Sequence, residues 1–203
     1  MNKSQLLQSL KQKGFSDKIL NAFSNVKREN FIPKQLKDMA YEDNALPIGN
    51  GQTISQPYTI AIILQMLNLK PRQKVLEIGS GCGYVLALIS EITKSKVYGI
   101  EIIKELAEKS KQNLKDYPDI SVYNRNGTEG LKEYAPFSRI LISAAIKEIP
   151  KTILNQLEDK GILVAPVDSD HSQDLIAIQR KNNSFIEKQR IHGFVFVPFV
   201  EKD

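Results

Sequence analysis

The glycine-rich run over residues 75–84 limits the possible folds of this chain more than any other segment. A short apolar stretch leads to the acidic residue Glu77 and reads as a strand. Glycines then alternate with small residues ahead of an apolar helix, at positions Gly79, Gly81 and Gly83. Because glycine has no Cβ atom, the backbone can turn sharply there and approach a ligand closely. The run therefore predicts a strand–turn–helix unit that binds a ligand, and a plain tight turn is the alternative.

The spacing of these glycines distinguishes between nucleotide ligands. A dinucleotide fingerprint reads G-x-G-x-x-G and brings a pyrophosphate onto the start of the helix. Here the order is G-x-G-x-G after Glu77, which resembles the pattern of S-adenosylmethionine-dependent methyltransferases. S-adenosylmethionine carries an amino acid group and a sulfonium cation instead of a phosphate, so the acidic residue Glu77 suits its cationic end.

A second acidic residue, Glu101, ends the next predicted strand over residues 96–101. It follows the glycine turn by about 20 residues, the distance at which a βαβ unit places a carboxylate near the ribose hydroxyls of a bound nucleoside. The alternative is an exposed residue at a helix start, where acidic side chains are favoured. The two acids and the glycine turn together predict a nucleoside-binding half-sheet.

Size and composition predict a single cytoplasmic domain of 203 residues. Hydrophobic residues make up 41% and charged residues 25%, as in ordinary globular proteins. One cysteine excludes an internal disulfide, and two histidines form no metal-binding cluster. No stretch approaches the ~18 apolar residues that a membrane span requires, and the first residues lead into an amphipathic helix, so we expect no membrane association.

The net charge of +5 does not indicate a nucleic-acid partner. The 28 basic residues are scattered among 23 acidic ones, and the densest cluster, at residues 104–115, alternates in sign as an exposed helix face does. Aromatic residues, on which bases stack, are not interleaved with a basic run. We therefore expect neither DNA nor RNA to bind.

The first part of the chain, residues 1–57, is predicted to be a helical entry followed by a long loop. Apolar positions recur at helical spacing over residues 4–13 and 16–25. Residues 41–57 are rich in glycine and proline and read as an irregular loop, which in a compact domain is usually functional or disordered. The apolar residues Leu46, Ile48 and Ile54 favour a functional loop.

The second part, residues 58–203, alternates between helix and strand patterns and predicts an α/β fold. We expect a Rossmann-like, doubly wound, mostly parallel sheet with helices on both faces and a C-terminal antiparallel hairpin. The predicted helices are 58–68, 83–93, 103–115 and one near 149–157, and the predicted strands are 74–78, 96–100, 120–124, 138–143, 161–167, 173–180 and 185–191. Ligands of such sheets bind outside the carboxyl ends of the strands, where Glu77 and Glu101 should converge.

The acidic segment over residues 168–174 is not predicted to bind a metal. An EF-hand-type loop needs glycine at its sixth position and glutamate at its twelfth. Gln173 and Gln179 occupy these positions, so we expect an exposed loop before the hairpin and no metal ion in this protein.

Several segments resemble the protein-L-isoaspartate O-methyltransferase family, and together they cover most of the chain. The most specific is Gly-Gln-Thr-Ile-Ser-Gln-Pro at residues 51–57, which general methyltransferases lack. The other matching residues are 22–23, 26, 28–29, 31–33, 46–49, 58, 75–84, 127–128, 130, 144–145, 148–150 and 196–198.

The resemblance implies methyl transfer from S-adenosylmethionine to the free α-carboxylate of L-isoaspartyl residues in damaged proteins and peptides. In the family, the serine matching Ser55 is the assigned active-site residue. An α-carboxylate with a pKa of roughly 3.5 is already ionised at neutral pH and needs no general base. Ser55 is therefore expected to donate a hydrogen bond that orients the carboxylate, and its alternative is a loop serine that satisfies a backbone group. We expect the enzyme to be a monomer.

The predicted binding residues form two sets. Those expected to hold S-adenosylmethionine and its product S-adenosylhomocysteine are Glu77, Gly79, Gly81, Gly83, Glu101, Asn126 and Gly127. Those that the resemblance implies for the peptide are Thr53, Ser55, Gln56, Ala144 and Val197, the last through its main chain. The family commonly has Gly-Asp-Gly where this chain has Arg125-Asn126-Gly127, so Asn126 can hydrogen-bond an adenine or sugar edge but lacks the charge.

Two other functions remain open from the sequence. One is a different S-adenosylmethionine-dependent methyltransferase that acts on a small molecule or RNA, against which the segment at residues 51–58 speaks. The other is a catalytically weak protein that binds isoaspartyl or acidic peptides, for which Asn126 is the sequence support.

Overall fold

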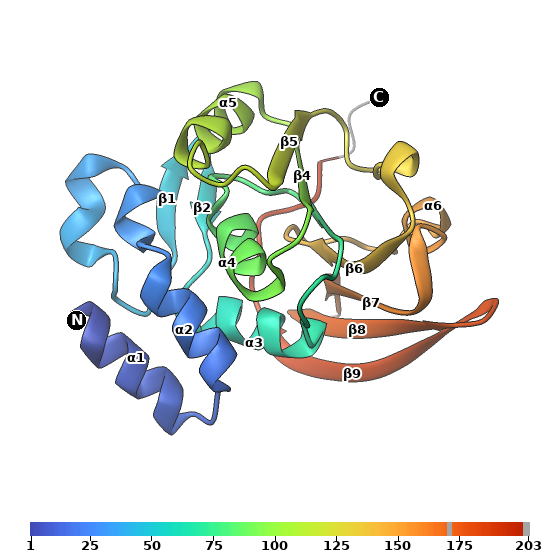
Figure 1. Ribbon diagram of the computed structural model, residues 1–203, viewed down its shortest axis with the longest axis horizontal. Coiled ribbons are helices and arrows are strands. Elements are labelled where there is room, and N and C mark those ends of the chain that lie inside the picture. The colour runs from blue at the N-terminus through green and yellow to red at the C-terminus, as the bar shows by residue number, and fades with distance from the viewer. Residues whose placement is uncertain (170–171, 201–203) are drawn as a thin grey trace.

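The computed structural model describes residues 1–169 and 172–200. Over these residues the main sheet has seven strands in the order β5-β4-β3-β6-β7-β8-β9 (Figure 1). The first five strands of that order are parallel to their neighbours, and β8 and β9 are antiparallel. The strands are β3 (Val75–Ile78), β4 (Val97–Glu101), β5 (Ile120–Asn124), β6 (Phe137–Ile142), β7 (Leu157–Asp168), β8 (Gln173–Lys181) and β9 (Ser184–Phe194). The predicted mostly parallel sheet with a C-terminal hairpin is confirmed.

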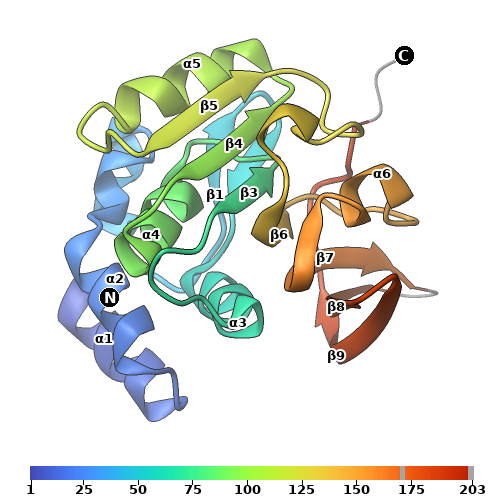
Figure 2. The ribbon, with the colours of Figure 1, turned by 45° about the vertical axis from the view of Figure 1, so that its right-hand side comes forward.

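Helices pack on both faces of the sheet because successive strand residues point to opposite sides. On β3, Val75 belongs to one apolar cluster and Leu76 to the other. The first cluster joins the sheet to α1 (Lys3–Gln12), α2 (Asp17–Asn25), α3 (Pro57–Leu67) and α4 (Tyr84–Thr93). The second includes Ile153 and Leu154 of α6 (Lys151–Leu154). This helix lies on the other side of the sheet (Figure 2).

The remaining helices are short or peripheral. Helix α5 (Lys104–Asn113) follows β4 and packs on β4 and β5. The described residues also form three 3-10 helices: η1 (Arg28–Asn30), η2 (Lys34–Met39) and η3 (Lys132–Tyr134). In the part of the chain that the structure describes, no helix has both the length and the apolar character needed to cross a bilayer.

The prediction of an irregular loop over residues 41–57 is wrong at its centre. Strands β1 (Leu46–Gly49) and β2 (Gln52–Ile54) form an antiparallel hairpin, with Leu46 opposite Ile54. Asn50 and Gly51 make its turn with φ of 53° and 70°. Both angles are left-handed, which a two-residue hairpin turn requires and an Asn-Gly pair adopts readily.

The predicted helix near residues 149–157 is also too long. Helix α6 ends at Leu154, because the chain then enters the sheet: Phe137 N–H donates to the carbonyl of Gln156 at 2.8 Å, and β7 begins at Leu157. The predicted strand over 161–167 is correspondingly longer, from Leu157 to Asp168. Of the predicted exposed loop that follows, residues 170 and 171 lie outside the described part of the chain.

Candidate active site

The glycine turn after β3 has the backbone conformation that only glycine adopts easily. Gly79, Gly81 and Gly83 have φ of 81°, 52° and 87°. At Gly83, which precedes the first residue of α4, a Cβ atom would lie 2.5 Å from Ser110 Oγ. Gly83 therefore lets α4 and α5 approach each other, and it lines none of the cavities described below.

Glu101 lies at the carboxyl end of β4, and its side chain is hydrogen-bonded to this turn. Its Oε2 accepts a hydrogen bond from Gly81 N–H at 2.7 Å, and its Oε1 accepts one from Ile103 N–H at 2.9 Å. A carboxylate has about four lone-pair sites. Two donors from the protein therefore leave capacity for the two hydroxyls of a ribose.

Glu77 lies at the end of β3 and is buried, with 1% of its surface exposed. Its Oε1 accepts a hydrogen bond from Ser143 Oγ at 2.7 Å, whereas its Oε2 is buried without a partner among the described residues. Burial, with a smaller contribution from Glu101, raises the pKa of Glu77 to about 8. An unpartnered buried carboxylate oxygen suits a cationic group, so this part of the site fits the amino end of S-adenosylmethionine.

A first cavity, with about 600 Å³ of empty space, opens beside the glycine turn. It is lined by hairpin residues from 48 to 53, by the ends of β3 and β4, by the segments that follow β3, β4, β5 and β6, and by the last described residues of the chain. Seven of the predicted binding residues line it: Thr53, Gly79, Gly81, Glu101, Gly127, Ala144 and Val197. Its volume suits a nucleoside-sized ligand.

Asn126 and Gly127 lie at this cavity in different ways. Gly127 lines it, and a Cβ atom there would lie 2.3 Å from Ile78 Cγ2, so the position requires glycine. Asn126 does not line it. The Asn126 Oδ1 instead accepts hydrogen bonds from the N–H and the hydroxyl of Thr128, both at 2.9 Å, which shapes the loop after β5.

Ser55 and Gln56 lie in a second, wider cavity between the start of α3 and the end of β9. Thr53 and Val197 line both the first and the second cavity. The Ser55 hydroxyl has no hydrogen-bond partner among the described residues and is half-buried, so it can donate to a ligand.

A small recess connects the two cavities. Ser55 and Glu77 line it together with Gly79 and Gly81 from the turn. Ser143 lines the recess and both cavities. No one cavity contains Glu77, Glu101 and Ser55, yet the shared lining residues make the three spaces adjacent.

The segment after β9 closes the site through main-chain contacts. Ala145 N–H donates to the carbonyl of Val197 at 2.8 Å, and Phe199 N–H donates to the carbonyl of Ala145 at 2.8 Å. These bonds hold Val197 and Ala144 against the first cavity. Phe196 is buried, as its apolar character leads one to expect.

Ser143, Phe199 and His192 are among the lining residues that were not predicted. Ser143 follows the end of β6, so the rule that ligands bind at the carboxyl ends of parallel strands pointed to its position. Phe199 and His192 had no such signal, because their approach depends on how the C-terminal segment folds back. Over residues 1–169 and 172–200, no group of three or more His, Cys, Asp or Glu side chains could hold a metal ion.

Comparison with known proteins identifies relatives that match over nearly the whole length of both chains. The whole chain, residues 1–203, matches the family described as protein-L-isoaspartate(D-aspartate) O-methyltransferase (PCMT). A protein-L-isoaspartate O-methyltransferase of Methanothrix thermoacetophila is 40% identical over 206 residues, which is 100% of this chain and 96% of the relative. One of Dictyoglomus turgidum is 42% identical over 199 residues, 97% of this chain and 90% of the relative.

A solved structure has the same fold over its full length. A Plasmodium falciparum protein described as a protein-L-isoaspartate O-methyltransferase, in complex with S-adenosyl-L-homocysteine, has a TM-score of 0.88 and 29% identity to this chain, and the match covers 100% of both chains.

Proposed function

This chain belongs to the protein-L-isoaspartate O-methyltransferase family, and we propose that it methylates the free α-carboxylate of L-isoaspartyl residues in damaged proteins and peptides. S-adenosylmethionine supplies the methyl group, and S-adenosylhomocysteine is the product. The observation that carries the proposal is the buried, unpartnered oxygen of Glu77 in a recess that also contains Ser55. It supports a cation-binding position next to a free hydroxyl.

The first cavity is the proposed site of S-adenosylmethionine. Glu77 receives the cationic amino end, Glu101 accepts the ribose hydroxyls, and the glycine turn leaves room for the ligand. Gly127 bounds the far side, where Ile78 already fills the space of a Cβ atom. Asn126 acts indirectly in this proposal, since its Oδ1 holds the loop that carries Gly127.

The second cavity is the proposed site of the peptide. The isoaspartyl carboxylate is ionised at neutral pH, so the residues here need only bind it and orient it toward the methyl group. Positioning of this kind contributes roughly 7–11 kcal/mol to catalysis. Ser55 donates a hydrogen bond to the carboxylate, and Thr53 and Gln56 line the same space. Val197 lines both cavities, and Ala144 lines the cofactor cavity beside it.

We further propose that the enzyme is a single-domain monomer and acts in the cytoplasm. In this proposal residues 1–57 form the peptide side of the site and residues 58–203 the cofactor side. Ser55 and Gln56, which line the second cavity, and Gly79, Gly81 and Glu101, which line the first, support this division, and Thr53 lines both cavities.

Paired peptides test the function directly. The enzyme and labelled S-adenosylmethionine are incubated with two peptides of one sequence, one with aspartate and one with isoaspartate. We expect label only in the isoaspartyl peptide. Equal labelling of both, or of neither, would contradict the proposal, and binding of the isoaspartyl peptide without transfer would indicate a binding protein instead.

Ser55→Ala tests the proposed role of the hydroxyl. A hydrogen bond to a charged group contributes about 1.5–3 kcal/mol, so we expect kcat/KM for the peptide to fall about 10- to 100-fold with S-adenosylhomocysteine affinity unchanged. Ser24→Ala, at an exposed position of α2, is the matched control and should leave both unchanged. Equal kcat/KM in the two variants would remove Ser55 from the mechanism.

A further inference from the structure

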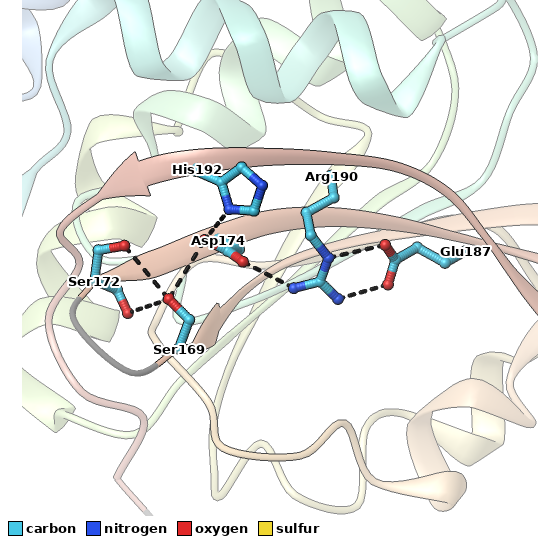
Figure 3. Close-up of polar contacts among 6 residues, drawn as sticks. All are labelled: Ser169, Ser172, Asp174, Glu187, Arg190 and His192. Atoms are coloured by element: carbon cyan, nitrogen blue, oxygen red, sulfur yellow. Dashed lines mark hydrogen bonds and ion pairs between the residues drawn. The ribbon is translucent and has the colours of Figure 1, made fainter.

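Strands β8 and β9 hold a buried carboxylate between two basic side chains. Asp174 is 3% exposed, and its Oδ2 accepts a hydrogen bond from Arg190 Nη1 at 2.9 Å. Its Oδ1 lies 2.9 Å from Nδ1 of His192. Glu187 in turn binds Arg190 through both of its oxygens, at 2.9 and 2.6 Å. Figure 3 shows His192 and Arg190 reaching Asp174 from the neighbouring strand.

This contact determines which ring nitrogen of His192 carries the proton. The Arg190 guanidinium holds the pKa of Asp174 below its usual range, so Asp174 is ionised and can only accept hydrogen bonds. The Nδ1 atom that faces it must therefore be the donor. In the neutral ring the other nitrogen, Nε2, is then a hydrogen-bond acceptor with a fixed orientation.

His192 lines the second cavity, the one that contains Ser55. Its side chain is 75% exposed, so Nε2 is accessible to a ligand. No Asp, Glu, Lys or Arg is among the described residues that line this cavity. Val195, 92% exposed, gives its rim an apolar surface. The cavity thus does not select a peptide by charge, and His192 offers an acceptor to a neutral donor.

We propose that His192 is a peptide-binding residue of this enzyme and that Asp174 positions it. The Nε2 atom accepts a hydrogen bond from a main-chain N–H of the substrate, at a residue that flanks the isoaspartyl residue. Isoaspartyl residues form in many sequence contexts, and the main-chain N–H is the neutral donor that these contexts have in common. The inference rests on the proposed function, since it assigns a contact within the same peptide site.

Kinetics with an isoaspartyl peptide test the role of His192. We expect His192→Ala to raise the peptide KM about 3- to 10-fold, as loss of a neutral hydrogen bond does, with kcat and the KM of S-adenosylmethionine unchanged. His192→Gln should recover much of the affinity, because its amide oxygen lies near the position of Nε2. Lys188→Ala, at an exposed position of β9 that lines none of the three described cavities, is the control. An unchanged peptide KM in His192→Ala would overturn the proposal.

A second variant tests the role of Asp174. Arg190 can only donate, so in Asp174→Asn the amide oxygen should remain on Arg190 and the amide nitrogen should face His192. We expect this variant to raise the peptide KM as His192→Ala does, and the double variant to show no further rise. Additive increases would overturn the positioning role.

NMR of the wild type tests the tautomer of His192. The ¹⁵N shifts of the two histidines, assigned with His171→Gln, should show that the proton of the neutral His192 ring is on Nδ1. A proton on Nε2 would overturn the role of Nε2 as an acceptor.

Peptides with single N-methylated amides leave the enzyme intact and locate the contact. One N-methyl position should raise the wild-type KM 3- to 10-fold and cause no further rise in His192→Ala. No such coupled position among the three residues on either side would overturn the main-chain contact. If the proposed function were wrong, the wild type would not methylate the unmodified isoaspartyl peptide at all. If only the role of His192 were wrong, the wild type would methylate this peptide and the expected changes in KM would be missing.

Discussion

At the scale of single residues, Glu77 shows how burial changes the chemistry of a side chain. Its position after a strand and before a glycine turn was predictable, because that pattern is local in the sequence. Its hydrogen bond from Ser143 spans 66 residues and could not be predicted. The same holds for its raised pKa, since the extent of burial depends on elements packed from both sides of the sheet.

The raised pKa of about 8 predicts a proton release when ligand binds. At pH 7 Glu77 is mostly protonated in the free enzyme, and a cationic amino group beside it favours the carboxylate. Calorimetric titration with S-adenosylhomocysteine in phosphate and in Tris should show release of a proton to the buffer. In Glu77→Gln we expect no release and about 10- to 100-fold weaker binding. Buffer-independent enthalpies in the wild type would contradict this assignment.

The same shift predicts how stability depends on pH. The folded pKa of Glu77 lies above the ordinary value of 4.5, so the folded state binds more protons than the unfolded state between pH 4.5 and about 8. The contribution of Glu77 to the free energy of unfolding therefore falls as pH rises through this window. Thermal unfolding of the ligand-free protein should show a weaker decline in Glu77→Gln than in the wild type.

At the scale of elements, hairpin β1–β2 places Thr53 between the two cavities. The Asn50–Gly51 turn is a local signal for a hairpin, yet the density of glycine and proline around it reads equally as a loop. The burial of Leu46 and Ile54 against the domain distinguishes a hairpin from an irregular loop here. That packing lies outside the segment itself.

Gly51→Ala tests the hairpin. Alanine at φ of 70° costs about 1–2 kcal/mol per residue, although no atom lies within 4 Å of the new Cβ atom. We expect a lower melting temperature and a higher KM for both substrates, because residues on either side of the turn line the cavities. Gly14→Ala is the matched control, with φ of 84° and equal space at the end of α1. It should lose similar stability and keep its KM values, and equal KM changes in both variants would point to a global effect.

At the scale of the whole molecule, the site is assembled from segments far apart in the chain. One cavity is lined both by the glycine turn near residue 80 and by the C-terminal residues Val197 and Phe199. A parallel sheet brings the carboxyl ends of its strands to one edge. The location of the site at this edge was therefore predictable. Only the family resemblance indicated that the C-terminal segment returns to cover this edge of the sheet.

Phe199→Ala tests this closure. The ring lines the cofactor cavity, and loss of apolar contact of this size costs about 1.5–3 kcal/mol. We expect S-adenosylhomocysteine affinity to fall about 10-fold or more. Phe185→Ala is the control, because Phe185 packs on the same apolar cluster from β9 but lines no described cavity. It should lower stability and leave affinity unchanged, and equal affinity in both variants would contradict the closure.

The sequence by itself determined the order of helices and strands, the glycine turn and the two acidic strand ends, because periodicity, turn chemistry and hydrogen bonding within a segment act over a few residues. Only the tertiary structure decided the ionisation of Glu77, the approach of His192 to the cavity of Ser55, and the closure by Phe199. These properties depend on burial and on contacts across the sheet, which arise only when distant segments pack together.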